Sequence, residues 1–236
     1  MKSKKIKSVQ RNIKFPTSSK IMYIPNTKQS KKSAVVRRHL KNGSWEKHIS
    51  KILYDNAKPN TNAIDIGGFI GTHTMALSDI KNKGSGKVYT FEPQPWACEL
   101  IKKNIKKNKI KNVKVYNVAL SNKNGTIQFC SDSTGGSTIC TEKKRSLKSW
   151  KQVYNVKMKP LDSYNITNVS IIKIDVEGHE ISVLEGALKT INKNKPKIVI
   201  EVWNRPKRQK EFFDFMKRIN YNVKKISGED YLCYPK

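Results

Sequence analysis

The chain has 236 residues, of which 36% are apolar and 28% charged, and this balance predicts one folded domain, or one domain with an appendage. Four cysteines are too few for a disulfide scaffold, and no apolar run approaches the roughly 20 residues of a membrane span. No apolar segment follows the first Met, so we expect no secretory signal.

The net charge is the most prominent bulk feature, because 48 Lys and Arg residues stand against 18 Asp and Glu, a formal charge of +30. The electrostatic field of such a charge attracts phosphate, nucleic acid or an anionic surface. The alternative is compositional: Lys, Asn and Ile dominate, as in a virus or an AT-rich microbe, and most lysines then coat the surface. The charge excess is spread along the chain, which argues against a single nucleic-acid-binding stripe.

The cysteines do not form a metal-binding pattern. No two of them make a CxxC pair, and no His lies at a zinc-like spacing from them; they are Cys98, Cys130, Cys140 and Cys233. We expect reduced, mostly packed thiols in an intracellular, cytoplasmic protein.

Residues 1–43 are expected to form a basic N-terminal arm that is partly flexible, although Ile21–Ile24 could add an edge strand. Residues 44–236 are expected to form the main domain. Its first helix should span Ser44–Asn56, with Ser44 as the N-cap.

The main domain then alternates between strand and helix patterns. Strands are expected at 61–66, 87–92, 113–118, 171–176 and 197–203, helices at 72–81, 95–108, 180–190 and 209–219, and a closing strand pair at 221–226 and 231–234. This alternation predicts an α/β fold, in which a mostly parallel sheet carries helices on both faces.

An insertion at about 122–160 separates the third and fourth strands. It lacks a strong helix pattern, and a segment of this length near the edge of the sheet is a candidate substrate lid. Its parts are two short strands at Thr126–Phe129 and Val156–Leu161, a loop at Ser131–Ser137 and a basic stretch at Lys143–Lys151.

A glycine-rich turn follows the first strand, in the segment Asp65-Ile-Gly67-Gly68-Phe-Ile-Gly71. Glycine permits positive φ and lets a ligand approach the backbone closely. The spacing differs from the dinucleotide pattern G-x-G-x-x-G, and a carboxylate beside the turn would repel pyrophosphate but suits a cationic amino-acid group. This favours S-adenosylmethionine over NAD; the alternative is a purely structural strand-to-helix turn.

The next two strands also end in polar residues. Glu92 could accept hydrogen bonds from both ribose hydroxyls of a nucleoside, and Asn117 with Val118 could contact adenine or the ribose edge. The alternatives are a solvated glutamate and an asparagine that only forms a turn.

Charged and titratable side chains are most concentrated in the segment Lys173-Ile-Asp175-Val-Glu177-Gly178-His179-Glu180. Lys173 and Asp175 share one face of a strand, and Asp175 lies at the carboxyl end of the sheet, where ligands bind in open α/β folds. The alternative is a capped helix start with surface charges.

The neighbouring strand ends at Glu201, followed by Asn204. Asp175 and Glu201 could hold a divalent cation, Mg²⁺ or Mn²⁺, with Asn204 as a further oxygen ligand. Otherwise Glu201 orients a substrate hydroxyl or a catalytic partner.

These motifs resemble the FkbM family of S-adenosylmethionine-dependent methyltransferases over about residues 60–204. Three further segments contribute to the resemblance: Phe91-Glu-Pro93, Asn117-Val-Ala-Leu-Ser121 and Leu161-Asp-Ser163. The resemblance implies a Rossmann-like class I fold with a seven-stranded sheet, and O-methylation of hydroxyls on sugars, glycans or related small molecules. It also implies a role for each position. Asp65, Gly67 and Gly71 would contact the methionine moiety, and the position of Gly68 usually holds a small residue in the family. Glu92 would contact the ribose, Asn117 and Val118 the adenine, and Asp175 would lie beside the transferred methyl.

A sugar hydroxyl is a poor acid, so methyl transfer to it benefits from a base or a metal ion. We expect His179 to be a base, Asp175 or an ion bound to it to activate the hydroxyl, and Lys173 to stabilise the alkoxide. The charge leaves two alternatives open, an RNA 2′-O-ribose methyltransferase and a non-catalytic basic binding protein that retains the fold.

Overall fold

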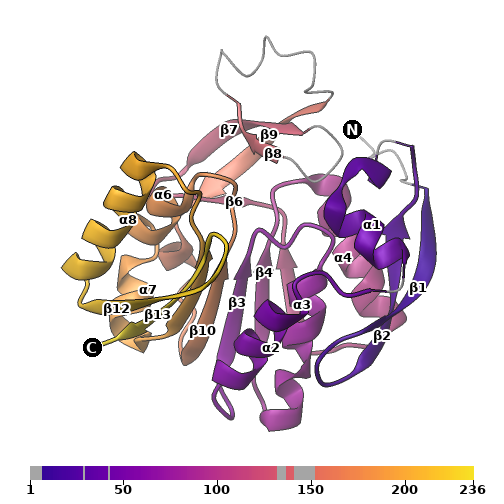
Figure 1. Cartoon of the computed structure of the whole chain (residues 1–236), viewed down its shortest axis with the longest axis horizontal. Coiled ribbons are helices and arrows are strands. Elements are labelled where there is room, and N and C mark those ends of the chain that lie inside the picture. The colour runs from indigo at the N-terminus through magenta and orange to yellow at the C-terminus, as the bar shows by residue number, and fades with distance from the viewer. Residues whose placement is uncertain (1–6, 29, 42, 132–136, 141–151) are drawn as a thin grey trace.

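The computed structural model describes residues 7–28, 30–41, 43–131, 137–140 and 152–236 (Figure 1). Seven strands form the central sheet, in the order β12 (Tyr221–Ser227), β13 (Asp230–Pro235), β11 (Lys197–Glu201), β10 (Val169–Ile174), β3 (Asn62–Ile66), β4 (Val88–Phe91) and β5 (Val113–Tyr116). Five strands, from β11 to β5, run parallel, and the β12–β13 hairpin adds an antiparallel edge. The predicted α/β class with a mostly parallel seven-stranded sheet is confirmed.

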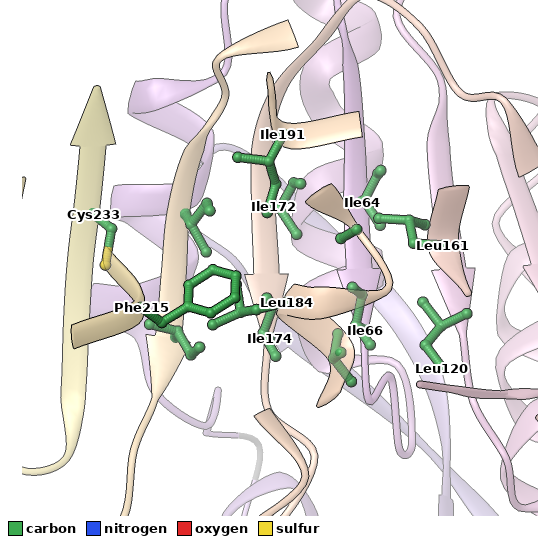
Figure 2. Close-up of a cluster of buried hydrophobic side chains, with 14 of the residues drawn as sticks. Ile64, Ile66, Leu120, Leu161, Ile172, Ile174, Leu184, Ile191, Phe215 and Cys233 are labelled. Atoms are coloured by element: carbon green, nitrogen blue, oxygen red, sulfur yellow. The ribbon is translucent and has the colours of Figure 1, made fainter. Parts of the chain in front are cut away.

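Helices cover both faces of this sheet (Figure 1). They are α2 (Lys47–Asn56), α3 (Thr72–Leu77) with the 3₁₀ turn η2 (Ser78–Lys83), α4 (Pro95–Lys107), η3 (Leu161–Tyr164), α6 (Glu180–Glu185), α7 (Leu188–Asn194) and α8 (Pro206–Arg218). Because successive strand residues point to opposite faces, Ile64 and Ile172 pack with Leu184 of α6 and Ile191 of α7 (Figure 2), whereas Ala63 and Ile171 pack towards α2. Strands covered on both sides are therefore largely apolar, and the buried charged exceptions, Asp65 on β3 and Lys173 on β10, lie near the carboxyl ends of their strands.

The helix expected at 72–81 ends as α3 at Leu77 and continues as the 3₁₀ turn η2, and the helix expected at 209–219 begins earlier, at Pro206. Two further predicted helices also differ from the observed ones. The helix expected from Ser44 begins at Lys47, and its N-cap is Glu46 in a left-handed conformation, so Ser44 does not cap it. The helix expected at 180–190 is divided into α6 and α7 near Gly186. A Cβ atom at Gly186 would lie 1.9 Å from the carbonyl oxygen of Ser121, so the break occurs where the backbone of the insertion passes close by.

The N-terminal segment has more regular structure than the expected flexible arm. It contains β1 (Ser8–Lys14), β2 (Ser19–Pro25), η1 (Ser30–Lys32) and α1 (Ala34–Leu40). Ile21–Ile24 does form a strand, but it pairs with β1 and not with the central sheet. Apolar side chains of this hairpin, such as Met22, belong to one buried cluster with Trp96 of α4.

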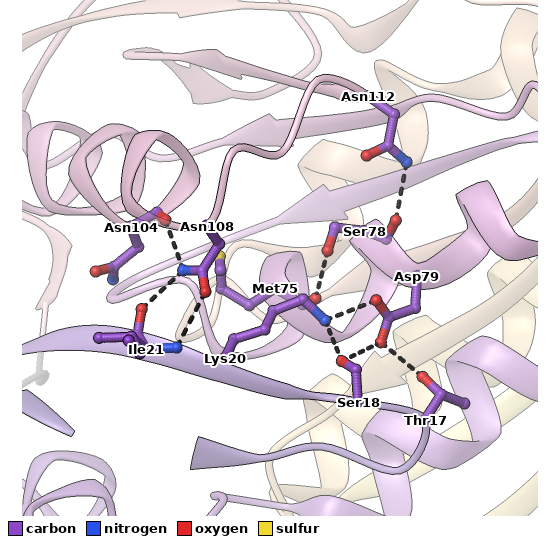
Figure 3. Close-up of polar contacts among 10 residues, drawn as sticks. All are labelled: Thr17, Ser18, Lys20, Ile21, Met75, Ser78, Asp79, Asn104, Asn108 and Asn112. Carbon is purple, nitrogen blue, oxygen red and sulfur yellow. Dashed lines mark hydrogen bonds and ion pairs between the residues drawn. The ribbon is translucent and has the colours of Figure 1, made fainter. Parts of the chain in front are cut away.

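Polar contacts also hold the hairpin against the main domain (Figure 3). Lys20 Nζ lies 2.7 Å from Asp79 Oδ1 in a buried ion pair, and the hydroxyls of Thr17 and Ser18 donate to the same carboxylate. The Asn108 side chain accepts from the backbone N–H of Ile21 and donates to its carbonyl. The hairpin is therefore docked through specific contacts as well as through apolar burial.

The insertion forms a second, four-stranded sheet in the order β6 (Ala119–Leu120), β9 (Gln152–Lys159), β7 (Gly125–Ser131) and β8 (Ser137–Ile139). The expected loop at 132–136 and the basic stretch at 143–151 lie outside the described residues. No helix in the described ranges is long and apolar enough to cross a membrane.

The expectation of four reduced cysteines is wrong for two of them. Cys130 on β7 and Cys140 after β8 form a disulfide, with Cα atoms 5.1 Å apart. The antiparallel pairing of β7 with β8 brings these residues together, and their sequence spacing carries no such signal. Cys98 and Cys233 are free and buried, as expected.

The Lys20–Asp79 pair provides a test of hairpin docking. Replacing Lys20 with Met should lower the free energy of unfolding by about 3 kcal/mol, because it leaves a buried carboxylate without its cation. Lys51→Met is the matched control, since the Lys51–Asp55 pair is exposed and should contribute less than about 1 kcal/mol. Chemical denaturation measures both losses, and equal losses would contradict the assigned role of the buried pair.

Candidate functional site

A cavity of about 340 Å³ lies at the carboxyl ends of β3, β4 and β10. This volume is within the usual range of small-molecule sites. Five of the predicted site residues line it: Gly67, Glu92, Val118, Asp175 and His179. The structure therefore brings together residues that are far apart in the sequence, because parallel strands end at the same edge of a sheet.

The glycine-rich turn lets two strands approach closely. Gly67 has φ +85°, and a Cβ atom there would lie 1.8 Å from the carbonyl oxygen of Asp175. The backbone N–H of Asp175 donates to the carbonyl of Ile66 over 3.0 Å, so the tips of β3 and β10 are joined at this point. Only glycine is compatible with this turn, which places Asp175 beside the cavity.

Gly68 and Gly71 serve the packing behind the turn. A Cβ atom at Gly68 would meet Thr90 Cγ2 at 2.6 Å, and Gly71 has φ +89° against Ile101. Neither residue is among those that line the cavity, within the part of the chain that the structure describes.

Asp65 is fully buried beneath the turn. Its Oδ2 accepts a hydrogen bond from the Thr74 hydroxyl, whereas Oδ1 has no partner among the described residues. A buried carboxylate oxygen without a donor is costly, and a donor from a bound ligand or a water molecule would remove that cost.

Glu92 is 3% exposed and lines the cavity. Its two oxygens accept the backbone N–H groups of Phe69 and Gln94, each over 2.7 Å. Burial raises the pKa of Glu92 to about 7, although both hydrogen bonds act in the opposite direction. The two backbone donors hold the carboxylate in a defined orientation at the end of β4.

Asn117 acts on the protein backbone. Its side-chain amide donates to the carbonyls of Glu92 and Pro93, each over 2.9 Å. It therefore supports the turn that carries Glu92, while the next residue, Val118, supplies an apolar wall of the cavity.

Lys173, Asp175 and Glu201 form one charged group at the ends of β10 and β11. Lys173 is buried, and its Nζ lies 2.9 Å from Asp175 Oδ2. Burial alone would lower the pKa of Lys173, but the charges of Asp175 and Asp65 raise it above its usual value. The lysine therefore stays protonated and stabilises the ionised Asp175.

Glu201 is the neutral member of this group. Burial, followed by the negative charge of Asp175, raises the pKa of Glu201 well above its usual range. Burial would also raise the pKa of Asp175, but Lys173 and a hydrogen bond with Glu201 lower it. A protonated Glu201 thus donates to an ionised Asp175.

The expected cation site is not supported. The two carboxyl groups expected to bind Mg²⁺ or Mn²⁺ are Asp175 and Glu201; Lys173 Nζ lies 2.9 Å from Asp175, and burial, followed by the charge of Asp175, raises the pKa of Glu201. Asn204 lies beyond them, and its backbone N–H donates to Glu229. Across the described residues, no group of three His, Cys, Asp or Glu side chains is placed to hold a metal ion.

His179 precedes α6 at the rim of the cavity, and its Nε2 lies 2.9 Å from the Ser121 hydroxyl. Burial, with a smaller contribution from the charge of Arg208, lowers the pKa of His179. The imidazole is therefore neutral at pH 7, and it can accept a proton. Glu180 instead accepts from the backbone N–H of Gly178 and stabilises the turn.

Sequence patterns missed several residues of this region. Glu46 Oε2 lies 3.2 Å from His73 Nε2, and the charge of Glu46 acts on both Lys173 and Asp175. The stretch Lys32–Val35 and Phe129 also line the cavity. They come from the N-terminal segment and the insertion, where no motif marked them.

The shared proton predicts a pH effect. The pKa of Glu201 rises from an ordinary value of 4.5 to about 9 in the folded protein, so its contribution to stability is present below 4.5 and is lost as the pH rises to about 9. Glu201→Gln cannot ionise and should flatten this dependence. Denaturation of both proteins between pH 5 and 9 measures it; parallel curves would show that Glu201 is not protonated in the folded state.

The site can be compared with known proteins. A family model described as "Methyltransferase FkbM domain" matches residues 65–223. The crystal structure of Methyltransferase FkbM from Methylobacillus flagellatus superposes with a TM-score of 0.55 at 17% identity, and the match covers 85% of this chain and 52% of that chain. This likeness concerns the fold.

Two curated relatives match more than half of the chain. Hexuronic acid methyltransferase AglP of Haloferax volcanii is 28% identical over 153 residues, which cover 62% of this chain and 59% of that protein. The 2-O-methyltransferase NoeI of Sinorhizobium fredii is 24% identical over 154 residues, 58% of this chain and 62% of that protein. The chain thus spans about three fifths of the length of these relatives, and the family match shows that it belongs to the FkbM methyltransferases.

Proposed function

We propose that this protein is an S-adenosylmethionine-dependent O-methyltransferase that methylates a hydroxyl of a sugar, a glycan or a related small molecule. One observation carries the proposal: a cavity at the strand ends of a methyltransferase fold is lined by three carboxylates, Glu92, Asp175 and Glu177, although the whole chain is strongly basic.

The residues present suit a cationic nucleoside. Asp65 has an oxygen without a donor among the described residues, as an ammonium group would require, and Glu92 presents an oriented carboxylate for ribose hydroxyls. Gly67 keeps the backbone free of a side chain at the turn. Val118 and Phe129 provide apolar walls for an aromatic base. S-adenosylmethionine, when bound, supplies a methyl group on a positively charged sulfur.

The chain's own residues then orient the acceptor and manage its proton. The ionised Asp175 faces the cavity, where it accepts a hydrogen bond from the acceptor hydroxyl and fixes its direction. Lys173 is bonded to Asp175 and buried, so we assign it as a positioning residue that keeps this carboxylate charged.

His179 is the proposed base. The tautomer that donates Nε2–H to the Ser121 hydroxyl leaves Nδ1 as a proton acceptor, and the lowered pKa of His179 keeps that atom free of a proton at pH 7. In this proposal, Asp175 orients the acceptor hydroxyl and His179 removes its proton.

A sugar acceptor is favoured by the two curated relatives, whose names refer to a hexuronic acid and to 2-O-methylation. The net charge of +30 supports methylation of RNA as the second candidate.

Cofactor binding gives the first test of this function. Glu92→Gln should weaken S-adenosylmethionine binding about tenfold, because a charged acceptor of the ribose hydroxyls becomes a neutral amide. Calorimetry on the folded variant measures this, with Glu99→Gln on the exposed side of α4 as the control. If the unaltered protein does not bind S-adenosylmethionine, the non-catalytic alternative is favoured instead.

Methyl transfer gives the second test. Labelled S-adenosylmethionine is incubated with separate pools of glycans, small sugars and RNA, with and without Mg²⁺ or Mn²⁺. We expect label in a saccharide pool without added cation, and at least a hundredfold loss in Asp175→Ala with the cofactor still bound, on the order of general acid–base effects. Normal turnover of Asp175→Ala would refute its role, and label only in RNA would favour the second candidate.

A further inference from the structure

A second hollow is larger than the cavity just described and, within the described residues, shares no lining residue with it. It has a volume of about 900 Å³ and lies between α1, the β1–β2 turn and the start of α2. We name it the α1–α2 groove. Its lining residues are Pro16, Thr17, Arg38, Ser44, Trp45, Glu46, Lys47, His48, Lys51 and Asp55. All of them precede residue 65, where the family match begins.

Two cations of the groove have no partner among the described residues. Arg38 and Lys47 are exposed, and neither makes an ion pair or a side-chain hydrogen bond within the described ranges. Lys51 pairs with Asp55 over 2.6 Å, and the Glu46 carboxylate contacts His73 over 3.2 Å. With three cations (Arg38, Lys47 and Lys51) against two carboxylates (Glu46 and Asp55), the groove lining has a formal charge of +1, and its two cations without a described partner are available to an anionic ligand.

Trp45 supplies an apolar surface in the same groove. Trp45 is half-buried, and in the sequence it stands between Arg38 and Lys47. An indole ring has a flat apolar face, on which the C–H side of a sugar ring can pack. A single aromatic plane with two cations suits a compact ligand. An RNA strand would need a longer basic track with several stacking side chains.

One residue that lines the groove, Glu46, is close enough to the charged group on β10 to affect it electrostatically. Glu46 lines the groove, contacts His73, and acts electrostatically on Lys173 and Asp175. His48 Nε2 lies 2.9 Å from the Ser227 hydroxyl, so the start of α2 also contacts the hairpin next to β11. The start of α2, which carries Glu46 and His48, therefore lies on the same side of the sheet edge as the end of β11.

We propose that the α1–α2 groove binds the acceptor, and that the acceptor is a saccharide with an anionic substituent, a carboxylate or a sulfate. Arg38 and Lys47 hold the anionic group, Trp45 stacks on a ring, and a hydroxyl of the same saccharide reaches Asp175. This inference rests on the proposed function, because it names the acceptor class for that site.

Calorimetry with the full chain tests the groove, with and without S-adenosylmethionine. The probes are a disaccharide ending in glucuronate, the same disaccharide ending in glucose, a sulfated disaccharide, and a short single-stranded RNA. We expect the glucuronate or the sulfated probe to bind about tenfold more tightly than the glucose probe. Whichever of the two binds more tightly identifies the anionic group.

Variants assign the binding to particular residues. Arg38→Gln and Lys47→Gln should each weaken binding of the anionic disaccharide about threefold to fivefold, and leave the glucose probe unchanged. Trp45→Ala should weaken both probes. Lys224→Gln removes an equally exposed charge on β12 and should change neither. Affinity for S-adenosylmethionine should stay the same in all four variants.

Three results would overturn the proposal: equal binding of anionic and neutral disaccharides, no effect of Arg38→Gln and Lys47→Gln, or tighter binding of RNA than of either anionic disaccharide. The proposed function fails differently, through absent binding of S-adenosylmethionine. The saccharide measurements made without that compound still test the groove in that case.

Discussion

The close approach of β3 and β10 is the contact on which the site depends. A hydrogen bond joins Asp175 to Ile66, and the absence of a side chain at Gly67 allows the two backbones to meet. This contact places Asp175 at the cavity instead of in the sheet. Lys173, two residues earlier on the same face, is then buried beside it and keeps it charged. Any side chain at residue 67 would separate these groups.

Charge is distributed unevenly in this protein. The chain carries +30 overall, yet its carboxylates gather at the carboxyl edge of the sheet, where Asp65, Glu92, Asp175 and Glu201 lie. Burying them together is unfavourable unless each is compensated. Backbone N–H groups offset only part of the cost for Glu92, whose pKa burial raises to about 7, whereas Lys173 stabilises the ionised Asp175 and burial raises the pKa of Glu201. Asp65 is fully buried beneath the turn, and one of its oxygens lacks a donor among the described residues.

The N-terminal segment supplies walls to both hollows of this protein. It precedes the family match, but it is docked by a buried ion pair and an apolar cluster, and it lines both the cavity and the α1–α2 groove. The cavity at the strand ends is thereby bounded in part by residues from outside the family match. Such walls can vary without disturbing the strand ends themselves.

Local patterns in the sequence were enough for the alternating strands and helices, the parallel sheet, and the strand-end residues Gly67, Glu92, Val118, Asp175 and His179, because these depend on periodicity and on short motifs. Tertiary structure decided the rest. The Cys130–Cys140 bond, the Glu46–His73 contact and the docking of β2 on α4 join segments whose spacing carries no signal. The raised pKa of Glu201 arises from burial beside Asp175, and burial is a property of the folded chain alone.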